Sequence, residues 1–328
     1  MPVIFNSDYK PPLILRNGHI NTILPAIFRK VKGIEYKRKR INTNDSDFID
    51  IDISSKGYER TAIILHGLEG NANKPYMKAM AKTCNEAGYD AIAMNLRGCS
   101  GDQNLLLSSY HSGKTDDLEF IIQYICKYMK YKQIILIGFS LGGNIVLKYL
   151  GEMDKYKPEI IKAGIAISVP CDLKSSAIQL SKFSNKLYLI RFLRSLKKKA
   201  IFKIEKFKVT TVNIEQIKSA GNFYDFDNLF TAWVHGFKNA EDYWEKCSSL
   251  KFLSAIRIPT YLFFAKDDPF LPFECYPLKE ADNNDYLHLE LTEYGGHVGF
   301  MTHTRFKKPN WHETRVKKLL SEELNALS

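Results

Sequence analysis

From Thr61 onward, short aliphatic runs alternate with amphipathic segments of helical length. Such alternation is typical of a parallel sheet with helices on its faces. We expect strands at 62–65, 90–94, 133–137, 163–168, 260–264 and 287–291, and helices at 76–87, 115–128, 141–150 and 311–324. Ahead of them, residues 34–41 and 48–53 flank the turn-rich NTNDSD and predict an antiparallel hairpin. The sequence therefore predicts an α/β fold with a mostly parallel central sheet.

One interval, residues 171–250, breaks this alternation because it shows helical periodicity and no convincing buried strand. Within it, apolar residues recur at spacings of three and four, which predicts one apolar helix face with the lysines on the other. These apolar residues are Leu189, Leu193, Leu196, Ala200, Ile204 and Phe207. We expect an inserted helical cap at 171–250, between two parts of one core at 1–170 and 251–328.

The positive charge of the chain is concentrated in one segment. Hydrophobic residues make up 45% and charged residues 25% of the 328 positions, which excludes a disordered chain. The formal net charge is +11, and the stretch Arg191–Lys208 holds eight basic residues against one acid. We interpret this stretch as a solvated cap helix, with weak association with anionic membranes as the alternative. No recognisable nucleic-acid-binding module accompanies it, so we expect no nucleic-acid partner.

The cysteines and the N-terminal segment indicate the compartment. Six cysteines are scattered without a C-x-x-C pair, which suits a reducing environment. The segment MPVIFNSDYKPPLIL contains two prolines and no basic region leading into a long apolar core, unlike a signal peptide. The longest apolar runs are far shorter than the ~18 residues that span a bilayer. We therefore expect a soluble, cytoplasmic protein.

The most specific motif is GFSLGG (138–143), which lies between the strand QIILI and an expected helix. In this context G-x-S-x-G presents the serine hydroxyl above the sheet on a tight turn. The flanking glycines remove Cβ atoms that would collide there, and the helix N-terminus favours a developing oxyanion. We predict Ser140 as a catalytic nucleophile.

A serine nucleophile requires a general base, and the base requires an acid that fixes its tautomer. AKDDPFLP follows the next-to-last expected strand, and EYGGHVGF follows the last one. The order serine, acid, histidine is the one expected for α/β-hydrolases. We predict His297 as the base and Asp268 as the acid, because Asp268 precedes Pro272 by four residues as is usual in hydrolases. Asp267 is the alternative acid.

Acyl transfer also requires an oxyanion hole, built from the N–H after the nucleophile and an N–H after an early strand. Here these groups belong to Leu141 and to Leu68, the latter within LHGLEG. A metal-dependent alternative built on the two aspartates, His297 and His303 has no ligand motif with helical spacing. We expect neither a metal nor a cofactor.

Seven motifs, in this order, resemble those of the YheT-like family of α/β-hydrolases, the type 4 family of the AB hydrolase superfamily. They are RNGHINTILP (16–25), HGLEGNANKPY (66–76), NLRGCSG (95–101), YHSG (110–113), GFSLGGN (138–144), AKDDPF (265–270) and GGHVGF (295–300). The resemblance covers nearly the whole chain. It implies the α/β-hydrolase fold and a serine hydrolase of esterase or lipase type with the triad Ser140, Asp268 and His297.

We therefore expect a serine carboxylesterase that forms an acyl-enzyme on Ser140 and acts on a small-molecule ester or lipid. The apolar cap favours medium-length acyl chains. The alternatives are a phospholipase, thioesterase or acyltransferase with the same triad, and a non-catalytic ligand-binding protein on the same scaffold. His19, His66 and His111 are interpreted as structural, and Arg97 fits either a substrate contact or a structural loop residue.

Overall fold

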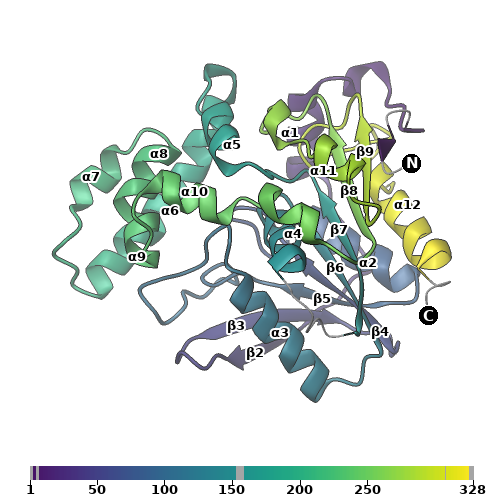
Figure 1. Ribbon diagram of the computed structural model, residues 1–328, viewed down its shortest axis with the longest axis horizontal. Coiled ribbons are helices and arrows are strands. Elements are labelled where there is room, and N and C mark those ends of the chain that lie inside the picture. The colour runs from purple at the N-terminus through teal and green to yellow at the C-terminus, as the bar shows by residue number, and fades with distance from the viewer. Residues whose placement is uncertain (1–2, 5–6, 153–158, 307, 325–328) are drawn as a thin grey trace.

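The computed structural model describes residues 3–4, 7–152, 159–306 and 308–324. Its nine-stranded sheet has the order β1-β9-β8-β7-β6-β4-β5-β3-β2. The strands are β1 (Val3–Ile4), β2 (Lys37–Asn42), β3 (Phe48–Ser54), β4 (Arg60–Leu65), β5 (Asp90–Met94), β6 (Gln133–Phe139), β7 (Ile161–Ile167), β8 (Thr260–Ala265) and β9 (Leu287–Thr292). The strand β3 pairs antiparallel with both β2 and β5, whereas the other neighbouring strands pair parallel. The predicted mostly parallel α/β sheet is confirmed (Figure 1).

Helices cover both faces of this sheet. They are α1 (Gly18–Phe28), α2 (Pro75–Glu86), α3 (Thr115–Tyr128), α4 (Leu141–Glu152), α11 (Leu278–Asp282) and α12 (Trp311–Lys318). The α3 and α4 helices pack together on one face, and α2 and α12 pack together on the other. None of the helices in the described part of the chain combines the length and apolarity needed to cross a bilayer.

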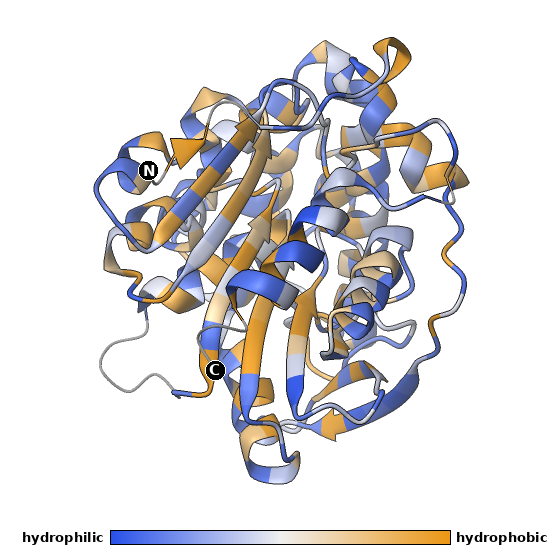
Figure 2. Cartoon of the chain, turned by 90° about the vertical axis from the view of Figure 1, so that its right-hand side faces the viewer, coloured by the Kyte–Doolittle hydropathy of each residue, from blue (hydrophilic) through white to orange (hydrophobic). Residues whose placement is uncertain are grey.

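The core is divided by the sheet into two apolar clusters. Along β4, Ile63 and Leu65 point into one cluster, whereas Ala62 and Ile64 point into the other. Because both faces of the sheet are buried, its central strands are almost continuously hydrophobic (Figure 2). This explains why the strands could be predicted as uninterrupted apolar runs.

The segment between β7 and β8 folds into helices that lie together beyond the sheet, on the left of Figure 1. These cap helices are α5 (Leu173–Leu180), α6 (Lys186–Lys206), α7 (Ile214–Ser219), α8 (Phe223–Phe226), α9 (Ala232–His235) and α10 (Ala240–Cys247). The predicted distribution of residues around α6 is wrong in part. Lys203 is 2% exposed and donates to Asn104 O at 2.7 Å, whereas Phe207, assigned to the apolar face, is 39% exposed. A lysine faces inward here because a loop of the core supplies acceptors for its ammonium group.

Candidate active site

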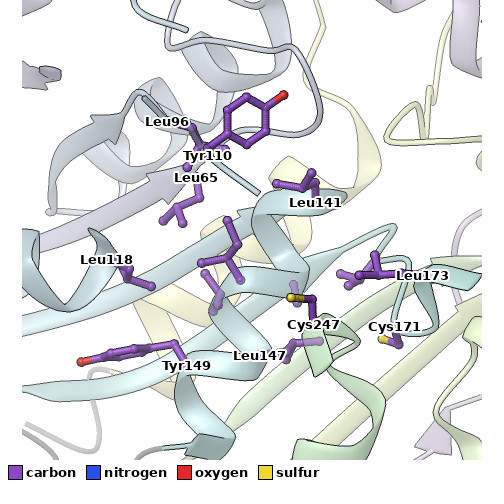
Figure 3. Packing of buried hydrophobic residues seen from close by; sticks show 14 of the residues in the cluster. Leu65, Leu96, Tyr110, Leu118, Leu141, Leu147, Tyr149, Cys171, Leu173 and Cys247 are labelled. Atoms are coloured by element: carbon purple, nitrogen blue, oxygen red, sulfur yellow. The ribbon is translucent and has the colours of Figure 1, made fainter. Parts of the chain in front are cut away.

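Ser140 occupies a strained turn between β6 and α4. Its φ is 51°, a left-handed conformation that is costly for a non-glycine residue. Its N–H donates to Ile167 O at 2.9 Å. A Cβ on Gly138 would lie 2.5 Å from Gly142 O, and one on Gly142 would lie 2.5 Å from Leu65 O. The glycines therefore permit the tight turn, and the apolar cluster beside it includes Leu141, Leu173 and Cys247 (Figure 3).

The predicted acid and base meet on the loops after β8 and β9. His297 Nδ1 lies 2.8 Å from Asp268 Oδ2, and Asp268 Oδ1 accepts from Phe270 N–H at 2.8 Å. Because a carboxylate can only accept, Nδ1 carries the proton and Nε2 is the basic nitrogen of the ring. The Phe270 ring lies 4.3 Å from the imidazole and restricts its movement. The Asp268 side chain is fully covered, whereas the His297 side chain stays partly exposed to the site.

Ser140 and His297 face the same space without a direct bond. Within the described residues, no hydrogen bond joins Ser140 Oγ to the His297 ring, although both line the same cavity and the same groove. Catalytic hydrogen bonds are often long in ligand-free enzymes and shorten when substrate binds. The assignment of Ser140, Asp268 and His297 as a triad therefore stays a prediction.

Asp267, the alternative acid, bonds to a different group. Its Oδ1 accepts from Gly296 N–H at 2.8 Å, and its Oδ2 is buried without a hydrogen-bond partner in the described part of the chain. Burial raises the pKa of Asp267 to about 6. The contacts of Asp267 are thus those of a residue that stabilises the loop after β9, which carries His297.

The two predicted oxyanion donors lie near Ser140 with free N–H groups. Neither Leu68 nor Leu141 donates its backbone N–H to an acceptor among the residues that the structure describes. A Cβ on Gly67 would lie 3.1 Å from Ser140 Cβ, so the loop after β4 passes close to the serine. Two unpaired donors on either side of a hydroxyl can stabilise negative charge on a substrate oxygen.

Two further conspicuous residues of the motifs are structural. His66 Nδ1 donates to Gly67 O at 2.8 Å and its Nε2 accepts from Leu96 N–H at 3.1 Å, while burial lowers its pKa to about 4. Arg97 is buried and forms ion pairs with three carboxylates, those of Asp45, Asp47 and Asp117. A guanidinium satisfied in this way is not available to a substrate.

Two residues that hold the loop carrying His297 were not predicted from the sequence. His297 N–H donates to Thr22 Oγ1 at 2.8 Å, and Val298 N–H donates to Ser168 Oγ at 3.0 Å. Thr22 belongs to α1 and to the motif RNGHINTILP, which was a usable signal. The same helix supports the acid loop, because a Cβ on Gly18 would lie only 1.8 Å from Asp267 O.

Two spaces meet at Ser140. A cavity of about 130 Å³ extends under the cap helices, and a groove of about 360 Å³ runs between α1, α2 and α6. Both are lined by Leu68, Ser140, Phe270 and His297. The cavity is mainly apolar, and its walls include Leu180, Leu196, Phe223, Phe226 and Phe230. The site can therefore hold a molecule with two parts that join at the serine.

Glu69 connects the loop after β4 to the helix α6. Its carboxylate accepts from Lys199 Nζ at 2.8 Å, from Tyr110 Oη at 2.8 Å and from Ser195 Oγ. Lys199 and Ser195 belong to α6, whereas Glu69 directly follows Leu68. The position of α6 is thus coupled to the loop that carries Leu68, one of the two predicted oxyanion donors.

No three histidine, cysteine, aspartate or glutamate side chains come together in a metal-binding arrangement among the described residues. The site described above is built from a hydroxyl, an imidazole, carboxylates and backbone amides. These groups suffice for acyl transfer through a covalent intermediate.

Comparison with known proteins identifies the family of this chain. Residues 62–304 match the family described as "alpha/beta hydrolase fold". The chain is 31% identical to the protein named "Putative esterase YheT" of Escherichia coli (strain K12), over 98% of this chain and 96% of that protein. It is 27% identical to phospholipase ABHD3 of Bos taurus, over 92% of this chain and 74% of that one. The Pyrococcus furiosus esterase Pf2001 has the same fold, with a TM-score of 0.58 at 19% identity over 89% of this chain and 96% of that one.

Proposed function

The chain belongs to the α/β-hydrolase family, and we propose that it is a serine hydrolase that cleaves carboxylic esters through an acyl-enzyme on Ser140. The observation that carries the proposal is the part-buried Asp268–His297 hydrogen bond beside the strained Ser140 turn. Family membership alone does not guarantee activity, because binding proteins also use hydrolase scaffolds. The proposal therefore depends on the site rather than on the fold.

In the first half-reaction, Ser140 Oγ attacks the ester carbonyl carbon while His297 Nε2 removes the serine proton. The carbonyl oxygen becomes an oxyanion that accepts hydrogen bonds from Leu68 N–H and Leu141 N–H. Asp268 stabilises the imidazolium and keeps Nδ1 protonated. The carbon–oxygen ester bond then breaks, and the departing alkoxide takes the proton from His297.

In the second half-reaction, His297 removes a proton from water, which attacks the acyl carbon attached to Ser140. The same two amides stabilise the second oxyanion. Ser140 Oγ leaves with the proton held by His297, and a carboxylic acid is released. An alcohol or a thiol in place of water would make the enzyme an acyltransferase, and a thioester substrate would make it a thioesterase. We propose water and an oxygen ester as the principal pair.

The apolar cavity under the cap is the proposed acyl site. A p-nitrophenyl ester series from acetyl to palmitoyl tests this function, with hydrolysis followed by release of p-nitrophenol. We expect the highest kcat/KM for medium-length chains, because additional methylenes gain apolar burial until the cavity is full. Failure of the protein to hydrolyse any ester of the series would contradict the proposed function.

The bridge between α6 and the oxyanion loop supplies a further prediction. Glu69→Gln is expected to lower kcat about tenfold for every acyl length, because the loop that carries Leu68 loses its charged partner on α6. The measurement is steady-state kinetics together with the unfolding midpoint. Glu241→Gln, which removes the exposed ion pair with Lys174, is the control and should leave kcat within about twofold. An effect of Glu69→Gln on KM alone would contradict the coupling.

The compartment and the membrane contact are further proposals. All six cysteine thiols are free, which supports the proposed cytoplasmic location. Arg191, Arg194 and Lys198 are exposed on α6, which supports weak, salt-sensitive association with anionic membranes. A phospholipase activity would combine this association with the same triad.

A further inference from the structure

The groove that meets the cavity at Ser140 is lined by two cationic side chains. Lys74, at the N-terminus of α2, and Arg191, on α6, both line it. No carboxylate or carbonyl accepts from the Lys74 ammonium or the Arg191 guanidinium among the residues that the structure describes. Arg29, which also lines the groove, is paired: it binds Glu313 through two hydrogen bonds.

The two cations line the same groove, and their like charges repel each other there. Burial and the positive charge of Arg191 together lower the pKa of Lys74, and Glu69 opposes this shift only in part. Glu69 is already occupied by Lys199, Tyr110 and Ser195. Holding two unpaired like charges near one another is unfavourable, and an anion bound between them would remove that cost.

We propose that Lys74 and Arg191 form a subsite for a phosphate group on the alcohol part of the ester. The acyl chain would occupy the apolar cavity, and the phosphate-bearing alcohol would occupy the groove, with the ester carbon at Ser140 between them. A guanidinium and an ammonium offer several donors to one phosphate, and the N-terminus of α2 adds its partial positive charge. This inference rests on the proposed function and identifies the leaving group. Ser140 Oγ bonds to the acyl carbon, the bond between that carbon and the alcohol oxygen breaks, and the phosphate-bearing alkoxide leaves with the proton from His297.

The test compares two esters that share an acyl chain and remain monomeric, 1-hexanoylglycerol 3-phosphate and 1-hexanoylglycerol. We expect kcat/KM to be at least about tenfold higher for the phosphate ester. Lys74→Met and Arg191→Gln should each reduce this ratio severalfold, and the double variant should bring it close to one. The control variants are Lys78→Met and Arg194→Gln. Lys78 and Arg194 lie about one turn further along the same helices, outside the groove, so these variants should leave the ratio unchanged.

Inhibition by the product, glycerol 3-phosphate, and by inorganic phosphate distinguishes a leaving-group subsite from a site for free phosphate. Glycerol 3-phosphate should inhibit hydrolysis of the neutral ester competitively in the wild type and not in the double variant. A ratio near one in the wild type would overturn the subsite, and so would inhibition by inorganic phosphate without a preference between the esters. If the wild type hydrolysed the neutral ester in either of these cases, the proposed function would remain intact. If neither ester were hydrolysed and Ser140 resisted covalent labelling, both proposals would fall.

Discussion

Ser140→Ala is expected to lower kcat for p-nitrophenyl butyrate by at least about a thousandfold, because it removes the hydroxyl on which the proposed acyl-enzyme forms. The variant should fold normally: alanine keeps the Cβ, and the φ of 51° is no more strained for alanine than for serine. The measurement is the initial rate, with far-ultraviolet circular dichroism to verify folding. Ser108→Ala, a serine outside both the cavity and the groove, is the control. Retention of more than about a tenth of the activity would refute the role of Ser140.

Asp268→Asn is expected to lower kcat by about 10⁴-fold. The amide can hold the imidazole in place, but it favours a proton on Nε2, and the ring then cannot accept the proton of Ser140. The matched variant is Asp267→Asn, which changes the adjacent carboxylate in the same way and should keep kcat within about threefold. Steady-state kinetics of the two variants decides which aspartate acts on His297. The opposite ranking would make Asp267 the acid.

The stability of Asp267→Asn provides an independent check on that residue. Since burial raises the folded-state pKa of Asp267 from 3.8 to about 6, folding favours its protonated form. Its contribution to stability is present below pH about 4 and is lost as the pH rises through 6. Asparagine has no charge to bury, so Asp267→Asn should not lose this stability as the pH rises. From pH 4 to pH 7.5, the unfolding free energy of the variant should therefore rise by about 1 kcal/mol relative to that of wild type, after allowance for the partial exposure of the carboxyl. Urea unfolding at both pH values measures this difference, and a pH-independent effect would contradict it.

The sheet was predictable because its strands are buried on both faces. Runs such as QIILI read directly as β6, and the turn-rich NTNDSD separated β2 from β3. The helix α1 was missed because it contains Pro25, lies among polar and glycine residues and has no counterpart in the strand–helix alternation. Its role became visible only in the fold, where Thr22 contacts the backbone of His297.

The site was predictable where it follows the order of strands and loops. Asp268 and His297 follow neighbouring strands β8 and β9, so their loops meet at one edge of the sheet. The cap was harder to interpret, because its inward lysines contradict simple amphipathicity. Lys199 and Lys203 face the core because Glu69 and the carbonyl of Asn104, more than ninety residues away in the sequence, supply their acceptors. A local pattern contains no information on such distant partners.

The central claim, that Ser140 is an activated nucleophile, is tested most directly by covalent labelling with a fluorophosphonate. Wild-type protein and Ser140→Ala would be incubated with the probe, and the modified peptide would be identified by mass spectrometry. We predict one phosphonate per wild-type chain, attached to Ser140, and none on the variant. An unlabelled wild-type protein, or a label on a different residue, would contradict the claim.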